Sequence, residues 1–195
     1  MTVAIRRCGI IPATMLLSPV RPLVVRIEVP NAREVDTRID ELVALLADAV
    51  ESGASVGYIL PLSVRELEAY WRGVARDVEG GMRQVLIAFD GERVVGSVQL
   101  FPCAKPNQPH RADVQKLMVL RAARGGGIGS ALMEALERRA AAIGRNLLTL
   151  DTRTGSVADA LYRHRGWTMA GRIPGYALDP DGTPAPASFY WKRVA

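Results

Sequence analysis

The stretch Val114–Gly129, which reads VQKLMVLRAARGGGIG, constrains the fold of this chain more than any other segment. An apolar run typical of a buried strand passes through a short basic turn into four glycines and then into residues that favour a helix. Amide N–H groups at the start of a helix have no partner inside the helix, and they carry the positive end of its dipole. Because glycine places no side chain over these groups, the segment predicts a strand, an anion-binding loop and a helix.

The sequence of this segment does not match two other types of phosphate-binding loop. A Walker A loop requires a lysine directly after its last glycine, but Ser130 follows Gly129. A Rossmann loop requires the spacing G-x-G-x-x-G, which the run from Gly125 does not supply, although Asp151 lies at about the right separation for the acid that binds ribose. A glycine-rich connection that binds nothing stays open on the loop alone.

Composition narrows the possible function classes. The chain has 195 residues, enough for one domain with a substantial core. Almost half of the residues are hydrophobic, yet no apolar run approaches the roughly 20 residues of a membrane span. The net charge is +5, and the arginines are dispersed rather than gathered among aromatic residues. We therefore expect an anionic cofactor, with neither nucleic acid nor a membrane as partner.

Cysteine and histidine are scarce in this chain. Cys8 and Cys103 lie far apart, and together with two histidines they offer no disulfide framework and no metal-ligand spacing. We expect no metal, reduced thiols and a cytoplasmic location. Residues 1–22 match a secretory signal poorly, because Pro12 interrupts the apolar part. They are interpreted as an N-terminal extension, either a disordered tail or residues upstream of a true start near Met15, before a single domain over residues 23–195.

Apolar periodicity predicts alternating strands and helices along the chain. Strands are expected at Leu23–Val29, Arg83–Phe89, Arg93–Phe101, Asp113–Leu120, Asn146–Leu150, Trp167–Gly171 and Ser188–Arg193. Helices are expected at Asp36–Val50 with Asp36 or Thr37 as N-cap, Ser63–Glu79 with a Ser63/Glu66 capping box, Gly127–Ile143 and Ser156–Arg165. Asp90-Gly91 predicts a hairpin turn, Pro102–Arg111 an exposed segment and Pro174–Pro186 a loop.

The glycine loop also carries a family resemblance. Arg124-Gly125-Gly126-Gly127-Ile128-Gly129 fits the pattern Q/R-x-x-G-x-G/A and closely resembles the pyrophosphate-binding segment of the GNAT acetyltransferases. The predicted order βααβββαβαβ, which comes before the closing strand Ser188–Arg193, is that of the GNAT fold. The resemblance implies an α/β fold, a mixed central sheet with helices on both faces. It also implies an N-acetyltransferase in which an amine attacks acetyl-CoA directly in a ternary complex.

The same resemblance implies how acetyl-CoA is held. Backbone N–H groups from Arg124 to Gly129 would bind the pyrophosphate, with Ser130 beside them and the Arg124 guanidinium adding a charge-assisted contact. The main chain of Met118 and Val119 would bond the pantetheine arm and polarise the thioester carbonyl. Ser156, in the segment GSVADALY, is expected to contact the same cofactor.

A second motif concerns the leaving thiolate. Leu161-Tyr162-Arg163-His164-Arg165-Gly166-Trp167 resembles the family's L-Y-x-x-x-G-F stretch, in which the tyrosine hydroxyl lies near the CoA sulfur. The resemblance implies that Tyr162 is the general acid. A phenol titrates at about 10 and a thiol at about 8.5, so a protonated Tyr162 can donate a hydrogen bond or a proton. The alternative is a tyrosine that only packs at a helix end. His164, on another helix face, is a weaker candidate.

The acceptor amine must lose a proton, and Asp113 occupies the place where several GNAT proteins carry a catalytic glutamate. Aspartate is one methylene shorter, which favours proton transfer through a water. It is equally open that Asp113 pairs with Arg111 or Lys116, or that it orients the substrate ammonium. Asp151, at the end of its strand, is a second candidate.

Strand alternation gives these side chains an expected direction. It places Asp113, Gln115 and Leu117 on one face of their strand and Val114, Lys116 and Met118 on the other.

Further segments resemble tabtoxin-resistance acetyltransferases, which acetylate an amine of a β-lactam amino acid. These segments are GASVGY, KPN, RADVQKLMVL, LDT, GSVADALY and PGY with the later DPDG. The resemblance implies a small amino-acid-like, antibiotic-like or toxin-like amine as acceptor, and Ser52–Leu62 and Pro174–Pro186 look able to cover such a ligand. The alternatives are a protein or peptide N-acetyltransferase and a CoA-binding sensor without turnover. A homodimer is a further expectation.

Overall fold

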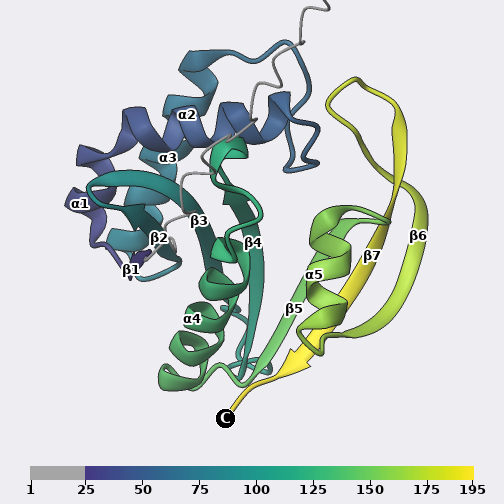
Figure 1. The fold of residues 1–195 in the computed structure, drawn as a ribbon. Coiled ribbons are helices and arrows are strands. Elements are labelled where there is room, and N and C mark those ends of the chain that lie inside the picture. The colour runs from purple at the N-terminus through teal and green to yellow at the C-terminus, as the bar shows by residue number, and fades with distance from the viewer. Residues whose placement is uncertain (1–24) are drawn as a thin grey trace, which may run out of the picture.

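The computed structural model describes residues 25–195, so the predicted extension over residues 1–22 lies outside the described residues. The described chain is built on one mixed sheet with the strand order β1-β2-β3-β4-β5-β7-β6 (Figure 1). Its strands are β1 (Arg26–Glu28), β2 (Gln84–Asp90), β3 (Arg93–Pro102), β4 (Arg111–Val119), β5 (Leu147–Arg153), β6 (Thr168–Leu178) and β7 (Pro184–Arg193). Its helices are α1 (Ala32–Thr37), α2 (Ile39–Glu51), α3 (Val64–Glu79), α4 (Ile128–Ala142) and α5 (Val157–His164), with a 3-10 turn at Arg121–Ala123.

Helices lie on both faces of the sheet, which confirms the predicted α/β class. Helices α1, α2 and α3 pack on one face of the N-terminal half, while α4 and α5 pack on the opposite face (Figure 1). Two apolar clusters lie on the two faces of the sheet, the first beneath α1, α2 and α3 and the second beneath α4 and α5. Side chains of β2 alternate between them, because Val85 and Ile87 belong to the first cluster and Leu86 to the second. The first cluster ends at Met118 of β4, and none of its members lies on β5, β6 or β7. In the described part of the chain, the apolar packing beneath α2 and α3 therefore stops at β4 and does not extend over the C-terminal strands.

Close contact between α4 and the sheet depends on one glycine. A Cβ atom on Gly96 of β3 would lie 2.9 Å from the carbonyl oxygen of Met118 and 3.1 Å from Cδ1 of Leu132. Because backbone cannot yield at that distance, only glycine lets α4 approach β3 so closely. This contact fixes the N-terminus of α4 beside the end of β4.

The first predicted helix begins earlier than expected and is divided in two. Asn31, not Asp36 or Thr37, is the N-cap of α1, because its side chain accepts from the Glu34 amide while the Glu34 carboxylate accepts from the Asn31 amide. Arg38 interrupts the helix between α1 and α2. The prediction failed because the reciprocal cap, set just after Pro30, begins the helix one turn before the apolar periodicity becomes visible.

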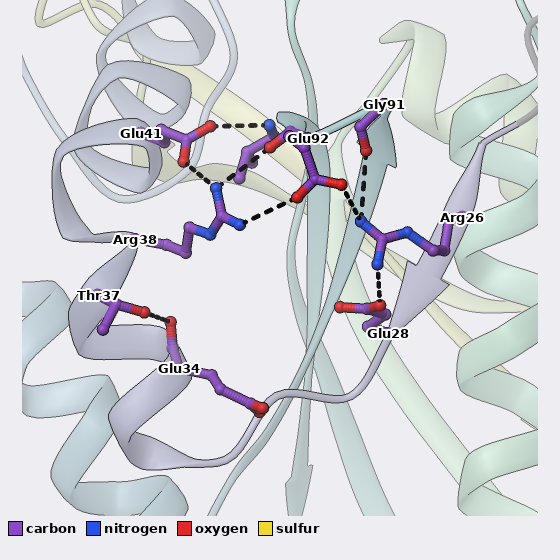
Figure 2. Close-up of polar contacts among 9 residues, drawn as sticks. Arg26, Glu28, Glu34, Thr37, Arg38, Glu41, Gly91 and Glu92 are labelled. Carbon is purple, nitrogen blue, oxygen red and sulfur yellow. Dashed lines mark hydrogen bonds and ion pairs between the residues drawn. The ribbon is translucent and has the colours of Figure 1, made fainter.

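A polar network joins the start of the described chain to the β2–β3 hairpin (Figure 2). Glu92 in the hairpin turn pairs with both Arg26 of β1 and Arg38, and Arg38 also donates to Glu41 of α2 at 2.8 Å. The two guanidinium groups lie over the Phe89 ring at 5.0 and 5.4 Å from its centroid. Arginine on an aromatic ring adds a cation–π attraction to the ion pairs. The network holds α2 against the sheet edge, far from β5.

The segment Pro174–Pro186 is not the loop that the sequence predicted. Strand β6 extends to Leu178 and β7 begins at Pro184, so only residues 179–183 form a turn. The register between β6 and β7 shifts between Ile173 and Ala177, which accommodates Pro174 and Gly175 in a bulge. Because β6 is an edge strand, a proline there removes no needed hydrogen bond. Pairing with β7 therefore overrides the local turn composition.

Strands β4 and β5 pair over three residues each and then separate. Arg111–Asp113 of β4 lie in parallel register with Leu147–Thr149 of β5. Beyond Asp113 the two strands diverge, as Figure 1 shows. The main-chain groups of β4 from Val114 to Val119 therefore face β5 without pairing to it. This divergence opens the middle of the sheet.

Candidate active site

A cavity of about 490 Å³ lies where β4 and β5 diverge. Its walls include Asp113 and Gln115 of β4, Thr149 and Asp151 of β5, and Phe189 and Trp191 of β7. A cavity of this size suits a small ligand, since small-molecule sites commonly measure about 300–1,000 Å³. The apolar rings on one side and the polar side chains on the other can orient such a ligand.

A β-bulge in β4 breaks the predicted alternation. Gln115 lies opposite Gln99 of β3, and Met118 lies opposite Ser97, so two residues of β4 face one residue of β3. Lys116, at the bulge, has a φ of 53°, a left-handed conformation that is rare outside glycine. Gln115, Lys116 and Met118 consequently lie on the same side of the sheet as α2 and α3. The expectation that Lys116 and Met118 share a face with Val114 was wrong.

The glycine loop lies at the start of α4, as predicted. Gly127 is the N-cap in a left-handed conformation, and no side chain caps the helix or adds an acidic group to its first turn. The first hydrogen bond of the helix runs from the Ala131 amide to the Gly127 carbonyl, so the amides of Ile128, Gly129 and Ser130 come before it.

Space for an anion surrounds these amides. A Cβ atom on Gly125 or Gly127 would meet no atom within 4 Å, whereas a Cβ on Gly129 would lie 3.4 Å from Cδ2 of Leu161. The loop residues from Arg124 to Gly127, including Gly126, are exposed. An open, uncapped helix N-terminus of this kind fits a phosphate group.

Arg124 crosses from this loop to another part of the chain. Its Nη2 donates to the Ser52 hydroxyl at 2.7 Å, and its Nε donates to the Val119 carbonyl at 3.0 Å. Met118 precedes Val119 in β4 and is buried. Its side chain belongs to the first apolar cluster, so only its main chain could bind a ligand. The structure thus places Arg124, Met118 and Val119 at one end of the divergence.

Asp113 lies at the opposite end of the divergence, at the last pair that β4 and β5 form. Its Oδ1 accepts from Nη1 of Arg111 at 2.5 Å and also from the Thr149 hydroxyl. The contact with Arg111 is the pairing that the sequence offered as an alternative, while a role of Asp113 as base stays a prediction.

Asp151 borders the same cavity and has no ion-pair partner among residues 25–195. Solvent reaches its side chain, yet the protein around the carboxylate makes burial the main cause of a raised pKa. The charge of Lys116 opposes this rise, and the charge of Asp113 adds to it. Burial favours the neutral acid, so this carboxyl group binds a proton more readily than a free aspartate.

Tyr162 lies on α5, and its side chain is 5% exposed. Its ring packs against Trp167 and Tyr190 with centroids 5.8 and 6.1 Å apart. Burial raises the pKa of the phenol well above its usual range, and the negative charge of Asp151 raises it further. The hydroxyl forms no hydrogen bond with any residue that the structure describes, so it keeps its donor for a ligand.

Two other candidate site residues, Ser156 and His164, lie at the two ends of α5. The Ser156 hydroxyl is the N-cap of α5 and accepts from the Asp159 amide at 3.1 Å. His164, near the other end of α5, is exposed. Within the described residues no cluster of histidine, cysteine and acidic side chains could hold a metal ion, and no helix there is long and apolar enough to cross a membrane.

A polar group that the sequence did not predict lies under the segment between α2 and α3, residues 52–63, here called the α2–α3 loop. Lys116 Nζ donates to the Val56 carbonyl at 2.6 Å and lies over the rings of Tyr58 and Tyr70. Arg83 Nη1 donates to Gln99 at 2.8 Å. These residues come from five separate segments, so only the position of Lys116 in a strand could have drawn attention to it.

The α2–α3 loop reaches across the open side of the sheet. The Leu60 amide donates to the Pro180 carbonyl at 2.8 Å, which joins this loop to the turn between β6 and β7. This hydrogen bond therefore connects the N-terminal half of the fold with its C-terminal hairpin.

Residues 42–167 match the Acetyltransferase (GNAT) family. An N-acetyltransferase from the hisH-hisA intergenic region of Azospirillum brasilense, described as uncharacterized, is 32% identical over 131 residues, which cover 65% of this chain and 76% of that protein.

Solved structures share the fold. A ribosomal-protein-alanine N-acetyltransferase from Brucella melitensis superposes with a TM-score of 0.71 at 24% identity, over 87% of this chain and 99% of that chain. The yncA protein from Salmonella typhimurium, solved with its cofactor acetyl-CoA, has a TM-score of 0.68 at 16% identity, over 88% of this chain and 94% of that chain. An acetyltransferase from the same organism that modifies the N-terminal serine of ribosomal protein L7/L12 has a TM-score of 0.71 at 15% identity, over 88% of this chain and 95% of that chain.

Acetyl-CoA is the usual co-substrate of the family, and the yncA structure contains it. The glycine loop, the divergent strands and the family match agree with one another. The chain therefore belongs to the GNAT acetyltransferase family and is an N-acetyltransferase.

Proposed function

We propose that this enzyme transfers the acetyl group of acetyl-CoA to the primary amine of a small molecule. The observation that carries the proposal is the uncapped N-terminus of α4, which lies at one end of the unpaired edge of β4, while the cavity lies at the other end. Acetyl-CoA, when bound, supplies a thioester whose acyl carbon accepts an amine as the carbon–sulfur bond breaks.

The pyrophosphate would lie on the amides of Ile128, Gly129 and Ser130. Open space at Gly125 and Gly127 leaves these amides accessible, and the helix dipole favours the negative charge. Arg124 can add a charge-assisted hydrogen bond once it leaves Ser52. Main-chain groups at Met118 and Val119, which do not pair with β5, would bind the pantetheine arm once Arg124 leaves the Val119 carbonyl, with Ser156 at the start of α5 as a further contact.

Tyr162 would donate its hydroxyl hydrogen to the sulfur of the leaving group. Its raised pKa keeps the phenol protonated at neutral pH. The same shift makes complete proton transfer to a thiolate less favourable, because a free thiol titrates at about 8.5. Stabilisation of the thiolate by a hydrogen bond is therefore the role that this environment supports.

The proton from the amine would leave by way of the carboxylates that border the cavity. Asp151 is the better placed acceptor, because its raised pKa brings it closer to the working pH and no arginine within residues 25–195 pairs with it. Asp113 is held by Arg111 and Thr149, so it would position a water or the substrate ammonium.

The acceptor is proposed to be small. The contact between Leu60 and Pro180 joins the α2–α3 loop to the turn between β6 and β7, and this link would restrict the path of an extended polypeptide across the sheet. An amino-acid-like amine fits the cavity volume, and an antibiotic-like or tabtoxin-like molecule is the narrower form of this proposal. The ribosomal-protein acetyltransferases share only the fold at their level of identity, so their acceptors do not transfer to this chain.

Calorimetry with acetyl-CoA tests the placement. Gly127→Val should abolish binding, because the side chain fills the space above the α4 amides. Gly144→Val is the matched control: Gly144 lies just past the other end of α4, and a Cβ there would also meet no atom within 4 Å. Both glycines have positive φ, 81° and 73°, so both variants carry similar backbone strain. Equal loss of affinity in both variants would contradict the placement.

Turnover is the second arm of the experiment. Release of free thiol from acetyl-CoA should appear with small primary amines and be absent with peptides that offer only an N-terminal amine in an extended chain. Turnover with peptides alone would instead make the enzyme a protein acetyltransferase.

A further inference from the structure

Lys116 is a cation without a counter-charge in the described part of the chain. Its Nζ has one hydrogen-bond acceptor, the Val56 carbonyl, and no carboxylate of residues 25–195 lies within 4 Å of it. Two aromatic faces complete its surroundings, with the ring centroids of Tyr58 and Tyr70 at 5.9 and 5.6 Å. An ammonium has three hydrogens to donate, so two remain for a ligand.

The surroundings of Lys116 disfavour its charge. Burial lowers its pKa, the nearby charge of Arg83 lowers it further, and only Asp151 acts in the opposite direction. Arg83 itself is paired with Asp77 at 2.8 Å, so it does not share the need for an anion. Buried charges in proteins are normally compensated by a partner, which makes a lone ammonium beside a ligand cavity unusual.

The β4 bulge brings Lys116 to the cavity side of the sheet. Gln115 lines the cavity, and the bulge leaves Lys116 on the same face as Gln115. The lysine side chain is flexible and can turn from Val56 toward the cavity. Gly57 leaves room for the ammonium in its observed position beside Val56, because a Cβ atom on Gly57 would lie 3.2 Å from Nζ.

Charge is distributed unevenly around the cavity. The carboxylates of Asp151 and Asp113 line the cavity, and Lys116, beneath the α2–α3 loop, lies close enough for its charge to act on Asp151. A molecule with a cationic amine at one end and an anionic group at the other matches this distribution. The amine end belongs near the carboxylates, where it must also lose its proton.

We infer that Lys116 determines acceptor specificity by binding a carboxylate group of the substrate, so that the acceptor is an amine that also carries a carboxylate. This inference rests on the proposed function, since it names the class of amine that the same site takes. Lys116 would exchange the Val56 carbonyl for the substrate carboxylate, and the aromatic rings would hold the stem of the lysine in place.

Paired substrates test the inference. Each common amino acid is compared with the amine in which hydrogen replaces its carboxylate, for example leucine with 3-methylbutylamine and phenylalanine with 2-phenylethylamine. Thiol release from acetyl-CoA gives kcat/KM, expressed per concentration of free amine so that different amine pKa values do not distort the ratio. For the best pair, the unchanged enzyme should favour the amino acid about 10- to 100-fold, as expected for a charge-assisted hydrogen bond.

Variants assign that preference to one side chain. Lys116→Met should reduce the ratio to about one, and the ratio within a pair cancels any general loss of activity. Lys116→Arg keeps the charge and should retain a preference for the amino acid. Lys105→Met removes an exposed lysine from another segment and should leave the ratio unchanged. Thermal melting of each variant shows whether it is folded.

The outcomes separate the two proposals. Turnover with both members of every pair at equal kcat/KM, or an undiminished preference in Lys116→Met, overturns the inference and leaves the proposed function intact. An absence of thiol release with every amine contradicts the proposed function, and the inference falls with it.

Discussion

Replacing Tyr162 by phenylalanine removes a hydroxyl that the fold does not use. Its oxygen makes no hydrogen bond to another described residue, and phenylalanine keeps the ring packed against Trp167 and Tyr190. The free energy of unfolding should change by less than about 1 kcal/mol, which for a chain of this size is a shift in Tm of at most about 2–4 °C. If the hydroxyl stabilises the leaving thiolate, kcat should fall about 10²–10³-fold, the usual effect of losing one such donor.

Tyr190→Phe is the matched control, because the two rings are neighbours and only one hydroxyl has a structural partner. The Tyr190 hydroxyl donates to Oδ1 of Asp159 at 2.5 Å, and Asp159 is 1% exposed. Loss of a hydrogen bond to a buried charge costs about 1.5–3 kcal/mol, which should lower Tm by about 3–12 °C. The folded Tyr190→Phe enzyme should keep kcat within a few-fold.

The assay measures kcat at saturating acetyl-CoA and Tm for both variants. Affinity for acetyl-CoA should stay nearly constant in Tyr162→Phe, because the hydroxyl acts as the thiolate forms. An unchanged kcat in Tyr162→Phe would make this tyrosine structural. A fall in Tm as large as that of Tyr190→Phe would show that its hydroxyl has a partner in the folded protein.

Two further predictions concern the carboxylates of the cavity. Asp151→Asn should slow acetyl transfer and raise Tm at neutral pH, because the folded state raises the pKa of Asp151 and so disfavours its charged form. That cost is absent below the unfolded pKa and complete above the folded one, so the difference in Tm should shrink from about pH 7 to about pH 4; a constant difference would refute this reasoning. Asp113→Asn should raise KM for the amine with little change in kcat if Asp113 holds the ammonium, and should lower kcat at neutral pH with partial recovery at high pH if it supports a water relay. Unaltered kinetics across the pH range would exclude both roles.

Local sequence patterns were enough to predict most of the fold. The helices at α2, α3 and α4 have strong apolar periodicity, and the apolar runs of β2 and β3 flank a turn that the sequence makes plain. The glycine loop could be predicted for the same reason, because its chemistry depends on consecutive residues. The predicted site residues, the cytoplasmic location and the homodimer stay predictions.

Features that depend on distant partners could not be predicted. The bulge at Lys116 arises from the register with β3, and nothing in the neighbouring residues marks it. Strand β6 continues through Pro174 because β7 pairs with it, although the local composition favours a loop. The group of Lys116, Tyr58 and Tyr70 forms only when α2, α3 and β4 have packed together.

The contacts of Arg124 connect two segments that are far apart in the sequence. This side chain fastens the glycine loop to Ser52, where the α2–α3 loop begins, and it also donates to the carbonyl of Val119. If Arg124 moves to a phosphate, as proposed, it gives up both contacts, and the α2–α3 loop loses one of its attachments. Binding of acetyl-CoA would then change the affinity for the amine, and thermodynamic reciprocity requires the amine to change the affinity for acetyl-CoA by the same factor.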